Sequence, residues 1–379
     1  MMMCCEPAGL QKEGAGVRKT VLFHAGLPKT GSTSIQHGLV SLADELRTRG
    51  IWVPYDRALY GSQFPNRAAP RGSPQSDGFS YFFNVRDLRP DTTVNWADTV
   101  AQFLRDDDAK TLVVSHENIS QAARRQRKDL FSALAAQADI RFLIYLRQPH
   151  SYLNSYCLQL VHGLGNPVAR ADMRPVTRYL KGGYAKLLAP FEDFGRVDAR
   201  NFDDLRKEDR LLPDFFTAIG AGDLGDRVAT LDSRNIRAPR LGLACVFMAL
   251  KSITPPQANT WFAMRAALFK AGVALEPPME TLFLPASLTA KISERWEQDR
   301  QILGERYGVQ FGDISDFRPG PETLSFSAQY GAALHAAVKT KLSASQNDWL
   351  AAALTLADQD LESVLALSSA EKGPSSPLR

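Results

Sequence analysis

The stretch VLFHAGLPKTGSTSIQ, residues 21–36, constrains the fold more than any other part of the chain. It joins a short apolar run to a loop of Gly, Pro, Lys and hydroxyl residues, and a helical pattern follows the loop. A strand that passes through such a loop into a helix directs the free N–H groups of the first helical turn at one point. That arrangement favours a bound oxyanion. We therefore expect an α/β fold in which this loop holds a phosphate-like group.

The loop differs from a Walker A phosphate-binding loop in the position of its lysine. A Walker A loop reads G-x-x-x-x-G-K-[ST]. Gly26 and Gly31 have that spacing, but Ser32 occupies the place of the Walker lysine, and the cation is Lys29 inside the loop. The hydroxyl residues that surround the turn are Thr30, Ser32, Thr33 and Ser34. The pattern predicts a phosphate-binding loop (P-loop) whose positive charge approaches the anion from the loop side.

Apolar runs alternate with helical patterns over about the first two hundred residues. Strands are expected at KTVLFHAG, IWVP, KTLVVS, IRFLIYL and RVDARNF. Helices are expected over residues 32–50, near 94–104 and 121–137, from Pro149 onward, and over 184–195. This alternation predicts a central parallel sheet with helices on both faces. In such a sheet, ligands bind at the carboxyl ends of the strands.

The rest of the chain reads as helical, with breaks near Pro255 and Pro277. Within it, LGLACVFMAL is too short to span a membrane and predicts a buried helix. We expect a flexible leader over residues 1–19, an α/β domain with a helical C-terminal part over 20–315, a helical extension over 316–370, and a disordered tail over 371–379.

Composition excludes several classes of protein. The net charge is +4 and the sequence pI is about 8.8, with Lys and Arg dispersed, which does not indicate a nucleic-acid partner. The four cysteines lack the spacing of zinc ligands, so we expect neither a metal site nor a disulfide framework. No apolar run approaches the roughly 18 residues of a membrane span, and the N-terminus does not resemble a signal peptide. These features predict a cytoplasmic protein.

The later strands lack the residue that would hold magnesium in a nucleotide kinase. Such enzymes place an Asp at the end of an apolar strand. Here the two corresponding runs end as VVSHE and IYLR, and the second ends in Arg147, which binds anions and not metals. The pattern therefore disfavours ATP with magnesium as the ligand.

Two motifs together carry a family resemblance. PKTGSTSIQ, followed far downstream by YLRQPHSYLNSY, resembles the sulfotransferases that use 3′-phosphoadenosine 5′-phosphosulfate (PAPS), including bacterial carbohydrate-type relatives. In that family the first motif holds the 5′-phosphosulfate, and an Arg with a Ser eight residues later holds the 3′-phosphate. Arg147 and Ser155 have that spacing. The resemblance covers roughly residues 20–220 and implies sulfuryl transfer from PAPS, without a metal, to a hydroxyl or amine acceptor.

Arg147 and Ser155 are expected to face the same phosphate. Arg147 leaves a strand end, and Ser155 lies about two turns into the helix that begins at Pro149. A dedicated clamp of this kind rejects a nucleotide that lacks the phosphate by about 10²- to 10⁵-fold, because the clamp is then left unpaired.

The acceptor must give up a proton to a base, and the resemblance supports two residues as candidates for that base. His116 stands where cytosolic sulfotransferases have a His, while Ser115 and Glu117 fit the Ser-x-Glu of bacterial relatives. Neighbouring residues that leave a strand point to opposite sides, so one of the two serves as the base. The pKa of a His suits the role unperturbed, whereas the pKa of a Glu must be raised. We favour Glu117, with His116 as the alternative, and both residues are also able to cap the next helix.

Two other residues and one loop have open interpretations. Phe202 stands where relatives place an aromatic near the adenine, although a core phenylalanine fits as well, and His24 reads as a satisfied core histidine. Residues 56–78 form a long polar stretch with aromatics and arginines, which suits either a lid over a carbohydrate, glycolipid-like or small-molecule acceptor or a surface insertion. Two further functions stay open: an atypical P-loop kinase, and a non-catalytic nucleotide-binding protein of the same fold.

Overall fold

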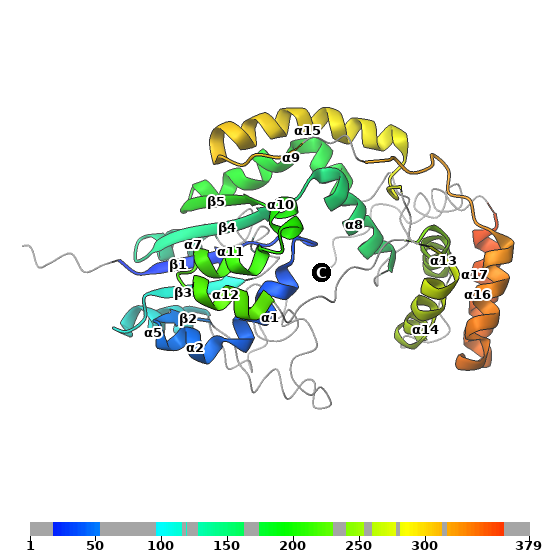
Figure 1. Ribbon diagram of the computed structural model, residues 1–379, viewed down its shortest axis with the longest axis horizontal. Helices are drawn as coiled ribbons and strands as arrows, with labels where there is room; N and C mark the ends of the chain where they lie inside the picture. Colours follow the sequence, from blue (N-terminus) through cyan, green and yellow to red (C-terminus); the bar gives the residue numbers. More distant parts are fainter. Residues whose placement is uncertain are drawn as a thin grey trace, which may run out of the picture.

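The computed structural model describes residues 18–53, 96–115, 119, 128–162, 174–229, 240–253, 260–277, 281–312 and 317–359. Its centre is a five-stranded parallel sheet with strand order β2-β3-β1-β4-β5 (Figure 1). The strands are β1 (Thr20–His24), β2 (Ile51–Trp52), β3 (Thr111–Ser115), β4 (Asp139–Leu146) and β5 (Arg196–Asn201). The predicted α/β fold class is confirmed, and each predicted strand is present.

Alternate residues of the central strand enter two separate cores, because successive side chains of a strand point to opposite faces. Val21 and Phe23 of β1 pack into one hydrophobic cluster, while Leu22 packs into the other. The first cluster is covered by α5 (Trp96–Arg105), α7 (Lys128–Ala135), α8 (Pro149–His162) and α9 (Arg174–Glu192). The second is covered by α1 (Ser32–Ser41), α2 (Ala43–Thr48), α10 (Phe202–Lys207), α11 (Leu211–Ala218) and α12 (Gly222–Ala229). Helices thus cover both faces, as expected for a buried parallel sheet.

The single helix predicted over residues 32–50 is two helices in the structure. The backbone of Leu42 leaves helical geometry, with φ −111° and ψ 12°, between α1 and α2. After this break, α2 packs against the short strand β2 that follows it in the chain. Gly50 ends the segment with φ 76°, and a Cβ there would lie 2.5 Å from the carbonyl oxygen of Asp108.

Helix α9 is longer than predicted, because it begins at Arg174 and includes a pair of glycines before the predicted start at residue 184. Gly183 has φ 60° and ψ −167°, a combination that only glycine adopts readily, and it kinks the helix. The Asp299 carboxylate of α15 (Ala286–Tyr307) fills the space beside it, and a Cβ on Gly183 would lie 2.2 Å from both carboxylate oxygens. Asp299 is fully buried and accepts a hydrogen bond from the Tyr184 N–H at 2.7 Å. The kink therefore lets α15 join α9 through a buried carboxylate.

The two adjacent glycines are expected to respond oppositely to substitution. Gly183→Ala should lower the free energy of unfolding by about 3 kcal/mol. Alanine does not readily adopt this backbone conformation, and its Cβ would displace the buried carboxylate of Asp299. Gly182→Ala should be neutral or stabilising by up to about 1 kcal/mol, since the three atoms nearest to a Cβ there all belong to the Lys186 side chain, whose end is free to move. Urea denaturation measures both variants. Equal effects at the two positions would contradict this account of the kink.

The C-terminal helices stack beside one another at the end of the molecule away from the sheet (Figure 1). They are α13 (Leu241–Ser252), α14 (Thr260–Leu275), α16 (Ala328–Val338) and α17 (Ala344–Ala357). The segment from Leu243 to Leu250 in α13 is buried throughout, which confirms the predicted buried helix. Within the described ranges, no helix has the length and apolarity needed to cross a membrane.

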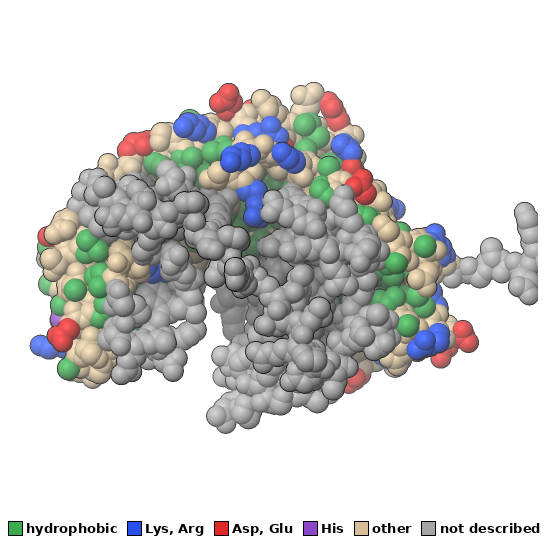
Figure 2. All heavy atoms as spheres, turned by 180° about the vertical axis from the view of Figure 1, so that it is seen from behind, with side chains coloured by type: hydrophobic (Ala, Val, Ile, Leu, Met, Phe, Trp, Pro, Cys, Tyr) green, Lys and Arg blue, Asp and Glu red, His purple; other side chains and the backbone are tan. Residues whose placement is uncertain are grey.

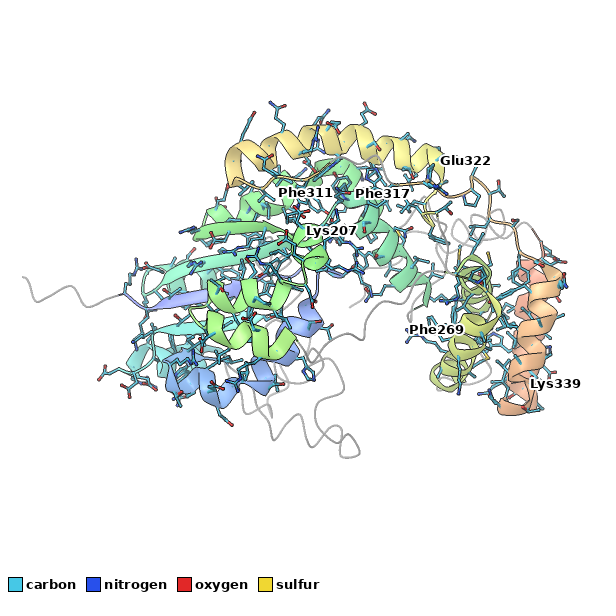
Figure 3. All side chains as sticks on the ribbon, in the orientation of Figure 1. Lys207, Phe269, Phe311, Phe317, Glu322 and Lys339 are labelled. Carbon is cyan, nitrogen blue, oxygen red and sulfur yellow. The ribbon has the colours of Figure 1, made fainter. Side chains whose placement is uncertain are left out.

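The segment that follows α15 returns over the start of α8. Phe311 and Phe317 lie beneath α15 in Figure 3. The Phe311 ring contacts Trp296 edge-on at 4.9 Å between centroids, and Phe317 stacks on His150 at 5.5 Å. The Gln148 side-chain amide also donates to the Gly312 carbonyl oxygen at 3.2 Å. These contacts fix the turn between β4 and α8.

Candidate active site

The predicted site residues follow strands that end at one edge of the sheet. The last residue of β1, His24, is in register with Ser115, the last residue of β3. On the other side it is in register with Leu143 of β4, which continues to Leu146. The P-loop, Arg147 and helix α10 therefore all begin at the carboxyl edge, where parallel sheets bind ligands.

The P-loop contains two residues in the left-handed backbone region. Gly31 has φ 77°, and Lys29, which is exposed, has φ 70°. A non-glycine residue in this region costs roughly 1–2 kcal/mol, and such strain gathers at functional sites. Thr30 is fully buried and its hydroxyl donates to the Leu27 carbonyl oxygen at 2.7 Å, so its side chain shapes the loop itself. Of the other predicted hydroxyls, Ser32 is buried, whereas Thr33 and Ser34 are half-buried.

Side chains from α10 and α11 support the P-loop from below. A Cβ on Gly31 would lie 2.3 Å from Leu211 Cδ2 and 3.2 Å from Phe202 Cε2. Phe202 is 5% exposed and belongs to the core on that face of the sheet. Its ring therefore packs against the loop, as the core interpretation of this residue predicts.

The structure brings Arg147 and Ser155 together. The Arg147 Nη1 donates to the Ser155 Oγ at 3.1 Å and approaches the Lys29 carbonyl oxygen at 3.5 Å. Helix α8 begins at Pro149, as predicted, which places Ser155 over the strand end. The guanidinium thus lies between the P-loop and the helix serine, where one anion can contact both.

Asp203 pairs with the same arginine, and the sequence analysis did not identify it. Its Oδ1 lies 3.3 Å from Arg147 Nε, although the N–H is not aligned for a hydrogen bond, and its Oδ2 accepts from the Gln148 N–H at 2.6 Å. Burial lowers the pKa of Arg147 and raises the pKa of Asp203, so for each group desolvation outweighs the attraction of the partner. The signal available in the sequence was its position just after a strand end, in the first turn of a predicted helix.

Three buried polar side chains connect β1, β3 and α1 beneath the P-loop. The His24 Nδ1 and the Ser115 Oγ are 2.7 Å apart, and the Gln36 side-chain amide donates to the Ser115 carbonyl oxygen at 3.1 Å. Burial lowers the pKa of His24 to about 3, so the ring is neutral near pH 7. Among the described residues, neither its Nε2 nor the Gln36 Oε1 has a hydrogen-bond partner. His24 is therefore a core histidine, as predicted, but within that part of the chain only one ring nitrogen is satisfied, whereas a fully satisfied ring was expected.

The remaining predicted site residues lie outside the described ranges. These are the two candidate bases, His116 and Glu117, and the polar stretch of residues 56–78. The base and the lid thus stay predictions.

Helix α9 presents several exposed basic side chains. Figure 2 shows Lys and Arg side chains at the top of the molecule, where α9 and α15 lie, with Asp and Glu side chains among them. Helix α9 carries exposed Arg178, Lys181 and Lys186. A surface of this kind attracts anions in general and does not select among them.

Similarity to known proteins is limited to distant structural likeness. No protein-family model matches the chain, and no curated protein matches it. Among solved structures, the chain is similar to a crystal structure of a sulfotransferase from Alicyclobacillus acidocaldarius. The identity is 14%, the match covers 76% of this chain and 96% of that one, and the TM-score is 0.39.

Proposed function

We propose that this protein is a sulfotransferase that moves the sulfuryl group of PAPS to a hydroxyl or amine acceptor. The observation that supports the proposal is the placement of two different anion-binding groups at one edge of the sheet. One is the P-loop with its strained Lys29, and the other is Arg147 with Ser155. PAPS carries a phosphosulfate and a separate 3′-phosphate, so it uses both groups, whereas ATP has no anion for the second.

Each group has a role in the proposed reaction. The loop amides and Lys29 bind the 5′-phosphosulfate, and Arg147 with Ser155 binds the 3′-phosphate. The acceptor oxygen or nitrogen attacks sulfur, the bond from sulfur to the 5′-phosphate oxygen breaks, and adenosine 3′,5′-bisphosphate leaves. Glu117 or His116 takes the acceptor proton, while Lys29 stabilises the charge that develops on the leaving phosphate.

The acceptor is proposed from composition alone. Residues 56–78 combine Tyr60 and Phe64 with Arg67 and Arg71, a mixture that suits a carbohydrate or glycolipid-like acceptor better than a flat apolar one. A lid over the acceptor would also exclude water, which competes for the sulfuryl group.

Nucleotide binding tests the proposal directly. We expect adenosine 3′,5′-bisphosphate to bind at least about 10²-fold more tightly than adenosine 5′-monophosphate, because only the former occupies the arginine clamp. Isothermal titration calorimetry measures both affinities, with ATP and magnesium as the third ligand. Tight binding of ATP without binding of the bisphosphate would replace the proposal with a kinase. Bisphosphate binding without transfer to any acceptor in a broad panel would indicate a non-catalytic protein.

A further inference from the structure

The main chain of Arg147 is held by a tyrosine from another helix. The hydroxyl of Tyr184 in α9 donates to the Arg147 carbonyl oxygen at 2.7 Å. Tyr184 is 2% exposed, and its ring packs against Tyr179, Tyr152 and Trp296 at centroid distances of 5.3, 6.1 and 6.2 Å. Burial raises the pKa of Tyr184 well above its usual value, so the hydroxyl keeps its proton and donates it. The packed ring therefore holds the Tyr184 hydroxyl in place as a donor.

Tyr184 is itself fixed by α15. Its N–H donates to the Asp299 Oδ2 at 2.7 Å, directly after the kink at Gly183. The Asp299 Oδ1 in turn accepts from Arg295 at 3.1 Å. A continuous set of contacts thus runs from α15 through α9 to the end of β4.

The carbonyl group that Tyr184 binds is attached to the Cα of Arg147, so holding it fixes the point from which the arginine side chain extends. The pairing of β4 with β5 ends at Leu146, so the ladder does not hold the Arg147 main chain. The same peptide is held at its other polar group by Asp203, which accepts from the Gln148 N–H. Because the carbonyl oxygen and the N–H of this one peptide are both bonded, the main chain directly after the Arg147 Cα is fixed before any ligand binds. A shift of about 1 Å at such a group is enough to lose much of its effect.

We propose that Tyr184 is a positioning residue for the anion clamp, holding the Arg147 main chain so that its guanidinium and Ser155 meet the same phosphate. This inference rests on the proposed function and deepens it, because it assigns the precision of 3′-phosphate recognition to a residue that does not touch the ligand. Through Tyr184, helix α15 and the kink in α9 also contribute to the geometry of the site.

Tyr184→Phe removes the hydroxyl and keeps the ring. We expect the affinity for adenosine 3′,5′-bisphosphate to fall about five- to tenfold, with the affinity for adenosine 5′-monophosphate unchanged, as measured by calorimetry. In an Arg147→Ala background the same change should have no further effect on the preference for the 3′-phosphate. Asp299→Asn, which weakens the anchor of Tyr184, should shift the preference in the same direction by a smaller factor.

Tyr179→Phe is the matched control. Tyr179 lies on the same helix in the same aromatic cluster, and burial and the nearby Asp299 raise its pKa, but it does not contact Arg147. The Tyr179 hydroxyl is buried and has no hydrogen-bond partner among the described residues, so Tyr179→Phe should leave thermal stability unchanged or slightly higher, and it should not change the ratio of the two affinities. A Tyr184→Phe protein with the wild-type ratio would overturn the positioning role alone. A wild-type protein that does not prefer the bisphosphate would overturn the positioning role and the proposed function together.

Discussion

Replacing Lys29 by Ala is expected to lower turnover of PAPS by about 10²- to 10³-fold at saturating donor. The reason is that negative charge gathers on the 5′-phosphate oxygen as the bond to sulfur breaks, and Lys29 is the cation that the P-loop supplies. Release of adenosine 3′,5′-bisphosphate, with water or a panel acceptor receiving the sulfuryl group, measures the rate. Turnover within a few-fold of wild type would remove Lys29 from the chemistry.

A second substitution at the same position separates catalysis from strain. Lys29 has φ 70°, and glycine relieves the cost of that backbone while alanine does not. We expect Lys29→Gly to be about 1 kcal/mol more stable than Lys29→Ala in urea denaturation, with turnover equally low. Equal stability of the two variants would mean that the left-handed backbone at this position is not strained.

Arg147→Ala is expected to weaken binding of adenosine 3′,5′-bisphosphate by about 2–4 kcal/mol, and to leave binding of adenosine 5′-monophosphate nearly unchanged. The loss is large because the guanidinium side chain is only 12% exposed, so water does not replace its bonds to the phosphate. Ser155→Ala should cost less, about 1 kcal/mol, since a neutral hydroxyl is lost. Calorimetry with the two nucleotides measures each change.

Asp203 supplies the control for this variant. Arg147→Ala leaves the half-buried carboxylate of Asp203 without its arginine, although the Gln148 N–H still donates to it, so stability falls as well as affinity. Adding Asp203→Asn should recover stability, because no unpaired charge remains, while the affinity for the bisphosphate stays low. If the double variant regained the affinity, the loss in Arg147→Ala would come from misfolding and the clamp would be disproved.

The sequence predicted the sheet well because its strands are short apolar runs bounded by polar residues. The strands β3 and β4 need no tertiary information to be recognised, and Pro149 marks the start of α8. The first half of α9 precedes a pair of glycines, which disfavour a helix interior, and the sequence analysis did not predict it. The Asp299 carboxylate that lies against Gly183 comes from a distant segment and leaves no local signal.

The part of the site formed by residues that are close together in the sequence was predictable. Arg147 and Ser155 lie on one strand end and the helix that follows it, so their separation along the chain is enough to bring them together. Asp203 and Tyr184 reach the same arginine from other elements, and their contacts depend on how those elements pack. No pattern within one segment predicts such a contact.

The support of Gly31 by Phe202 and Leu211 has a consequence for the synthesis of the chain. The strand before the loop occupies the middle of the sheet, and its partners β3 and β4 both come later in the sequence. The P-loop lacks a neighbouring strand until β4 has been made, and it lacks the side chains that hold its turn until synthesis has passed the middle of the chain. Domains fold as units once enough chain has emerged. The earliest motif in the sequence therefore takes shape only after more than half of the chain has been made, and a nucleotide cannot assist folding until α11 has left the exit tunnel.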